Sequence, residues 1–133
     1  EDVVIIDAHE GDKVLIPPGY GHVTINPGKE PLVMSNLIER NFISIYGPFS
    51  EACGAAYYEV LEGDMPVFVE NEHYSEVPEP RLVEPQELPG LGLVKGVPLY
   101  TAFVENPLAY RYLVRPHLFK ETLAGFLNKT GDQ

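Results

Sequence analysis

The sequence has few cysteines, few basic residues and no long apolar run, and each shortage excludes a class of structure or partner. Cys53 is the single cysteine, so no intrachain disulfide can form, and we expect a reducing, cytoplasmic location. Nine basic residues against 20 acidic ones give a net charge of -11, which argues against nucleic acid and anionic membranes as partners. No apolar stretch approaches the roughly 18 residues that a membrane-spanning helix needs.

The length of the chain and its scattered prolines and glycines favour one domain built from short elements. The 133 residues fit one domain, and 13 prolines and 12 glycines are scattered singly, which favours short strands and turns over long helices. The acidic balance still permits a small anionic substrate, because a site needs only local positive charge or a metal. The sequence begins at Glu1 rather than methionine and shows no basic-plus-apolar leader, so we expect an upstream segment to have been removed.

The stretch from Gly11 to Asn26, GDKVLIPPGYGHVTIN, reads as strand, tight turn, strand. Residues 14–16 are an apolar run typical of a buried strand, and Pro17-Pro18-Gly19 turns the chain. In residues 22–26, polar and apolar side chains alternate, which places His22, Thr24 and Asn26 on one face. That face either meets water or lines a pocket.

The remaining chain divides at residue 70 by composition. Residues 1–70 predict six or seven short strands with turns between them, which is the pattern of a sandwich or barrel. Residues 71–133 predict a proline-rich extended arm interrupted at Val83-Glu84, followed by short helices. We expect one helix after Pro98, a second from Pro107, an amphipathic last helix over 118–127, and frayed residues 128–133. The strands are expected at 3–7, 14–16, 22–26, 32–38, 42–46, 54–61 and 65–70.

Histidine and cysteine are the candidates for chemistry. A lone histidine on a strand is more often a surface residue than a ligand, although neutral imidazole is the commonest metal ligand, so His22 stays open on chemistry alone. His9, His73 and His117 show no HxH or HExxH spacing and are read as solvated. Cys53 has no basic neighbour in sequence and is read as a small buried thiol.

The Gly11–Asn26 stretch matches the second motif of the cupin superfamily, G-x5-P-x-G-x2-H-x3-N. Gly11, Pro17, Gly19, His22 and Asn26 fill its fixed positions. The resemblance implies a cupin double-stranded β-barrel, jelly-roll-like, with the histidine inside it as a metal ligand. Residues 1–70 would then be the barrel portion, and residues 71–133 would be an extension of the same domain.

A longer resemblance narrows the family. The run PPGYGHVTINPGKEPLVMSNLIERNFISIYGP with GAAYYEV is similar to the cupin-type glucose-6-phosphate isomerases of archaea and bacteria, and GVPLY…ENP…YLVRP to a C-terminal extension of longer members. This implies metal-assisted proton transfer between glucose 6-phosphate and fructose 6-phosphate, with a hydride shift as the competing scheme. His22 would bind a divalent metal (iron, or manganese, zinc or nickel), and Tyr46 would lie near the substrate as a catalytic residue. Thr24 shares the face of His22, and Asn36 has the pocket-facing parity of Ile38, so we expect both to contact the sugar phosphate.

The resemblance also sets a limit. Cupins place three metal ligands and the catalytic glutamate of this family in a first motif, HxH plus a Glu, which these 133 residues lack. Tyrosine and histidine positions of short members are occupied by Ile38 and Ser44. We therefore expect one wall of an active site, inactive alone, in a homodimer that covers the incomplete barrel. A non-catalytic sugar-binding or interaction module, and another metal cupin such as a sugar-phosphate epimerase or a dioxygenase, stay open as alternatives.

Overall fold

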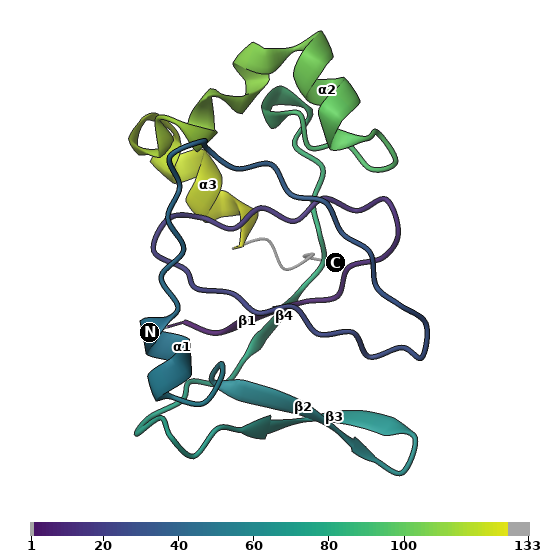
Figure 1. Cartoon of the computed structure of the whole chain (residues 1–133), viewed down its shortest axis with the longest axis vertical. Coiled ribbons are helices and arrows are strands. Elements are labelled where there is room, and N and C mark those ends of the chain that lie inside the picture. Colours follow the sequence, from purple (N-terminus) through teal and green to yellow (C-terminus); the bar gives the residue numbers. More distant parts are fainter. Residues whose placement is uncertain (1, 128–133) are drawn as a thin grey trace. The chain divides into compact units, whose positions relative to one another are not determined.

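The structure is a computed structural model that describes residues 2–127 (Figure 1). Residues 128–133, which were expected to fray, lie outside the described residues. Contacts divide the chain into two compact units whose segments interleave along the sequence. Within the described residues, unit 1 holds 2–3, 21–34 and 43–79, and unit 2 holds 4–20, 35–42 and 80–127.

Unit 1 contains a β-hairpin and a short helix. Strand β2 (Tyr57–Glu62) pairs antiparallel with β3 (Met65–Glu70) (Figure 1). The register runs from Tyr57 opposite Glu70 to Glu62 opposite Met65. Gly63 has a φ of 67° in the two-residue turn, where a residue without Cβ is favoured. The hairpin expected from the sequence is therefore confirmed.

A helix stands where the sequence predicted only a break. Helix α1 (Gly47–Glu51) begins with Pro48 in its first turn, where the missing N–H of proline costs no hydrogen bond. Its end is closed by Gly54 N–H donating to Phe49 O at 2.8 Å, which leaves Cys53 in the left-handed region at a φ of 56°. Cys53 is exposed in this turn, so the expectation of a buried thiol is wrong.

Unit 2 is tied together by a parallel strand pair. Strand β1 (Val4–Ile6) pairs with β4 (Arg81–Val83), with Ile6 opposite Val83. The sequence predicted that the extended arm is interrupted at Val83-Glu84. Val83 is instead a buried, paired residue of β4, so the prediction is wrong for Val83. The local sequence could not predict this, because a parallel partner lies far away along the chain.

The C-terminal part of unit 2 is helical, as the sequence predicted, in shorter pieces. Helix α2 follows Pro98 as expected, and Pro107 starts the next turn. The last helix begins at Lys120 rather than at residue 118, because the turn that starts at Pro116 is a 3-10 helix. In order, the elements are η1 (Pro89–Leu91), α2 (Leu99–Glu105), η2 (Pro107–Leu113), η3 (Pro116–Phe119) and α3 (Lys120–Phe126).

The hydrophobic core belongs to unit 2 and is built mainly from the C-terminal segment. Tyr110 and Tyr112 pack with centroids 6.1 Å apart, and Phe119 meets Tyr112 edge-on at 6.4 Å. Leu15 joins this core while its neighbours Val14 and Ile16 are exposed, so the expected strand 14–16 is an extended, half-buried segment. The buried members are Leu15, Leu91, Leu93, Tyr110, Tyr112, Leu123, Phe126 and Leu127.

Four of the expected strands carry no strand pairing. Residues 14–16, 22–26, 32–38 and 42–46 lie outside the two two-stranded sheets, so the described fold is a small mixed α/β structure. Val33, Ile43 and Ile45 are 80–89% exposed, so no neighbouring strand covers them in the described chain. A closed β-barrel is not shown by these sheets and stays a prediction. No helix within residues 2–127 has both the length and the apolar character that crossing a membrane requires.

Candidate functional site

The motif Gly11–Asn26 begins at a point where two backbones come close together. Gly11 has a φ of 85°, and its carbonyl accepts a hydrogen bond from Gly96 N–H at 2.9 Å. A Cβ at Gly11 would lie 3.2 Å from the nitrogen of Gly96. The first fixed glycine of the motif is thus required both by its dihedral angle and by this contact within unit 2.

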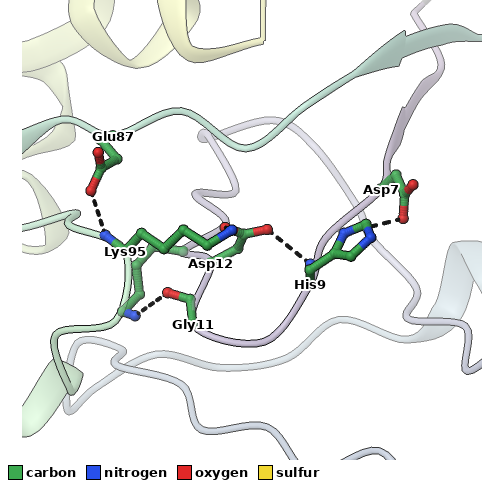
Figure 2. A network of polar contacts seen from close by, with 7 residues as sticks. Asp7, His9, Gly11, Asp12, Glu87 and Lys95 are labelled. Atoms are coloured by element: carbon green, nitrogen blue, oxygen red, sulfur yellow. Dashed lines mark hydrogen bonds and ion pairs between the residues drawn. The ribbon is translucent and has the colours of Figure 1, made fainter.

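A polar network holds the same contact from the side chains. Asp12 Oδ1 lies 2.7 Å from Lys95 Nζ, and Asp12 Oδ2 accepts from His9 N–H at 2.8 Å. The backbone N–H of Lys95 donates to Glu87 Oε1 at 2.6 Å, and Asp7 lies 3.8 Å from the His9 ring. Figure 2 shows these contacts running from Glu87 through Lys95 and Asp12 to His9. The network anchors the start of the motif to the loop before α2.

Asp12 and Lys95 shift each other's protonation in the direction of the charged pair. The hydrogen bond from Lys95, followed by that from the His9 amide, lowers the pKa of Asp12 below its ordinary 3.8. The same hydrogen bond raises the pKa of Lys95 above its ordinary 10.5. Both groups are therefore charged across the physiological range, and neither is suited to exchanging protons at pH 7.

The middle of the motif is the expected tight turn. Tyr20 N–H donates to Pro17 O at 3.3 Å, and Gly19 has a φ of 89° at the third position of the turn. Proline second and a positive-φ glycine third are the features of a type II turn. The prediction that Pro17-Pro18-Gly19 reverses the chain is confirmed.

The end of the motif serves the backbone. Asn26 Oδ1 accepts from Gly28 N–H at 3.1 Å, and Asn26 Nδ2 donates to Glu30 O at 2.8 Å. This is an Asx-type turn that closes residues 26–30. Sequence reasoning placed Asn26 on the same polar face as His22, and the structure gives its amide this loop-closing role.

The four predicted site residues are exposed and are divided between the units. His22, Thr24 and Tyr46 belong to unit 1, whereas Asn36 belongs to unit 2. Tyr46 is 72% exposed directly before α1, and its carbonyl accepts from Ser50 N–H at 2.9 Å. Their roles toward metal and substrate stay predictions.

The described residues do not fit a metal ion by themselves. No group of three or more His, Cys, Asp or Glu side chains able to hold a metal occurs within residues 2–127. A protein metal site takes three or four such ligands, and His22 supplies one. A metal at His22 would need ligands from outside these residues.

Asn71 is a structural centre that sequence reasoning missed. It is 1% exposed and is the one buried residue among those described in unit 1. Its Nδ2 donates to Ala52 O at 2.8 Å and to Ala55 O at 2.9 Å, and its backbone N–H donates to Ala56 O at 2.9 Å. An asparagine at the start of a turn is a sequence sign of local hydrogen bonding, but it does not reveal burial.

Two tyrosines complete the same turn. Tyr58 OH donates to Cys53 O and Tyr74 OH to Gly54 O, each at 2.9 Å. Together with the bonds of Asn71, five successive carbonyls from residue 52 to residue 56 are satisfied. The loop between α1 and β2 is therefore fixed by hydrogen bonds, not by apolar burial.

Comparison with known proteins gives one match. The family model described as Glucose-6-phosphate isomerase (GPI) matches residues 1–77, which is more than half of the chain. No curated protein and no solved structure matches. The matched residues include the whole Gly11–Asn26 motif and all four predicted site residues.

Proposed function

The chain belongs to the glucose-6-phosphate isomerase family, and from this premise we propose that it forms part of an enzyme that interconverts glucose 6-phosphate and fructose 6-phosphate. The observation that carries the proposal is the extent of the family match. It spans residues 1–77 and so covers the four expected site residues, His22, Thr24, Asn36 and Tyr46.

The reaction moves one proton between neighbouring carbons, so the residues of the site must hold the substrate in line with the base. A base removes the proton from C2 of the open-chain aldose, and the electrons move to the C1 carbonyl oxygen to give an enediolate. The proton then returns to C1, the O2 hydroxyl proton passes to O1, and the C2 carbonyl of the ketose forms. We assign Tyr46 to the reacting carbons through its hydroxyl, and Thr24 and Asn36 to hydrogen bonds with the sugar phosphate. The base is a carboxylate supplied from outside these residues, as the resemblance implies.

The proposal includes a divalent metal ion. A divalent ion (iron, or manganese, zinc or nickel) would polarise the carbonyl, and His22 would be this chain's ligand. Because residues 2–127 hold no group of three candidate ligands, the ion requires further ligands from outside these residues.

The proposal includes a cupin barrel, a homodimer and a cytoplasmic location. The cupin barrel is retained because Gly11, Pro17, Gly19, His22 and Asn26 fill the fixed positions of the second cupin motif. A homodimer is supported by unit 1, whose described residues include no buried apolar side chain. A cytoplasmic location suits a sugar-phosphate substrate and the free thiol of Cys53.

The test is made in the complete gene product. Conversion of fructose 6-phosphate is followed by coupling to glucose-6-phosphate dehydrogenase, and bound metal by elemental analysis. His22→Ala should lose activity and metal together, while the control His9→Ala, with a side chain that is 71% exposed, should keep both. Retention of activity by His22→Ala would refute the proposed role. Deuterium from D2O should enter the product if a proton is transferred, and should be absent for a hydride shift.

A non-catalytic sugar-binding module is the second candidate, and the missing ligand group within residues 2–127 favours it. It predicts that the complete gene product binds fructose 6-phosphate by calorimetry without turning it over. The isomerase proposal predicts both binding and turnover, so the two assays together separate the candidates.

A further inference from the structure

A cavity of about 410 Å³ lies within unit 2, beside the motif turn. One wall is the turn itself, with Pro17, Pro18 and Tyr20. The other wall is η3 and α3, which contribute His117, Lys120 and Leu123. The volume falls in the range of small-molecule sites, and most of the lining is apolar, as is usual for such sites.

The charge of the lining differs from that of the chain. Lys120 and His117 are its two groups that can carry positive charge, and no carboxylate lines the cavity, although the whole chain has a net charge of -11. Both side chains belong to exposed residues, three positions apart, so their polar ends can reach the mouth while apolar side chains form the walls. An anionic group would find attraction at this mouth.

The lining also excludes one obvious ligand. No Asp, Glu, Asn, Gln, Ser or Thr lines the cavity, and Tyr20 and His117 offer few partners for sugar hydroxyls. A sugar phosphate would leave most of its hydroxyl groups without hydrogen bonds there, which costs binding energy. The cavity is therefore distinct in chemistry from a sugar-phosphate site.

We propose that this cavity binds a small organic anion with an apolar body, held by Lys120 at the mouth and by the turn and α3 around the body. The proposal does not depend on the isomerase activity, because none of the residues assigned to that activity lines the cavity.

The first test uses two probes that differ in charge. Binding of 1-anilinonaphthalene-8-sulfonate and of its neutral analogue N-phenyl-1-naphthylamine is followed through the NMR amide signals of Leu123 and Ala124, two residues that line the cavity. Lys120→Gln should weaken the sulfonate about fivefold to tenfold and leave the neutral analogue within twofold. The control Lys29→Gln removes an exposed charge that does not line the cavity and should change neither affinity.

A second test blocks the cavity. Ala124 lines it, so Ala124→Phe should abolish binding of both probes at the Leu123 signal, whereas Thr101→Phe on α2 should not. Saturating fructose 6-phosphate should not displace the sulfonate. The proposal is overturned if Lys120→Gln leaves the sulfonate affinity unchanged, if both probes weaken equally, or if the shifts fall on residues 32–46 instead.

Discussion

The side chain of Asn71 donates a hydrogen bond of 2.8 Å to the carbonyl of Ala52, nineteen residues earlier in the chain. The same amide nitrogen reaches Ala55 O, and its oxygen accepts from both the backbone N–H and the ring Nδ1 of His73. A single buried amide thus ties the end of α1 to the residues after β3. These hydrogen bonds hold unit 1 together, whereas unit 2 is stabilised by an apolar core.

Asn71→Ala should therefore destabilise unit 1 more than a typical polar substitution. It removes the donor that serves the carbonyls of Ala52 and Ala55 and leaves a small buried void, for an expected loss of about 2–4 kcal/mol. The measurement is urea unfolding followed by the NMR signals of β2 and β3. Asn106→Ala is the control, because Asn106 is exposed and makes no side-chain cap bond, and it should stay within about 0.5 kcal/mol. Equal losses in the two variants would contradict the assignment.

The ion pair of Asp12 and Lys95 predicts a defined pH window. Asp12 has a lowered pKa in the folded chain, so its contribution is present above pH 3.8 and is lost as the pH falls through the folded value. Lys95 has a raised pKa, so its contribution is present below pH 10.5 and is lost as the pH rises through the folded value. The pair should therefore contribute a constant amount from about pH 4 to 10.

Lys95→Met tests this window directly. The carboxyl carbon of Asp12, followed by NMR titration, should show a higher pKa in the variant than in the parent chain, because the first cause of the lowering has gone. Lys29→Met, which removes a lysine of unit 1, should leave the titration of Asp12 unchanged. An Asp12 titration that is identical in Lys95→Met and the parent would show that the pair is not formed in solution.

The two motif glycines should respond differently to alanine. Gly11 and Gly19 both have positive φ, at 85° and 89°, so each alanine carries a strain of about 1–2 kcal/mol. Gly19 has open space around it, whereas alanine at Gly11 must also displace the backbone of Gly96. Thermal unfolding should thus place Gly11→Ala about 1 kcal/mol or more below Gly19→Ala. The close approach would be disproved by variants of equal stability.

The elements that the sequence predicted are those fixed by neighbouring residues. The turn at Gly63 follows from glycine's tolerance of positive φ, and the helix that starts after Pro98 follows from the fixed φ of proline and an amphipathic spacing. Helix α1 is not predicted, because a proline after a glycine fits a break between strands as well as the first turn of a helix.

What the sequence could not predict depends on distant partners. The pairing of Ile6 with Val83 and the burial of Asn71 depend on segments far apart in sequence, and periodicity carries no information on them. In the candidate site, the sequence predicts the turn at Pro17-Pro18-Gly19, and the positive φ values at Gly11 and Gly19 explain why glycine stands there. The sequence cannot predict the role of His22 from local geometry, because metal binding there depends on ligands that residues 2–127 do not supply.

Unit 1 should be an association surface. Val33, Ile43 and Ile45 are 89%, 81% and 80% exposed within unit 1, and we expect a partner chain to cover them. Extended segments without paired neighbours also offer free backbone groups to a second chain. We expect light scattering at micromolar concentration to give twice the 14.8 kDa of one chain.

Ile45→Glu decides whether this surface forms the dimer. A carboxylate in an apolar interface is costly, so the dissociation constant should rise at least about tenfold, and dilution should yield monomers. Leu118→Glu places the same charge at a 58% exposed position of unit 2 and should leave the dimer intact. If the parent chain is monomeric, or if Leu118→Glu alone dissociates it, then the exposed apolar residues of unit 1 are not the interface. In that case a partner other than a second copy of this chain would bind these exposed apolar residues.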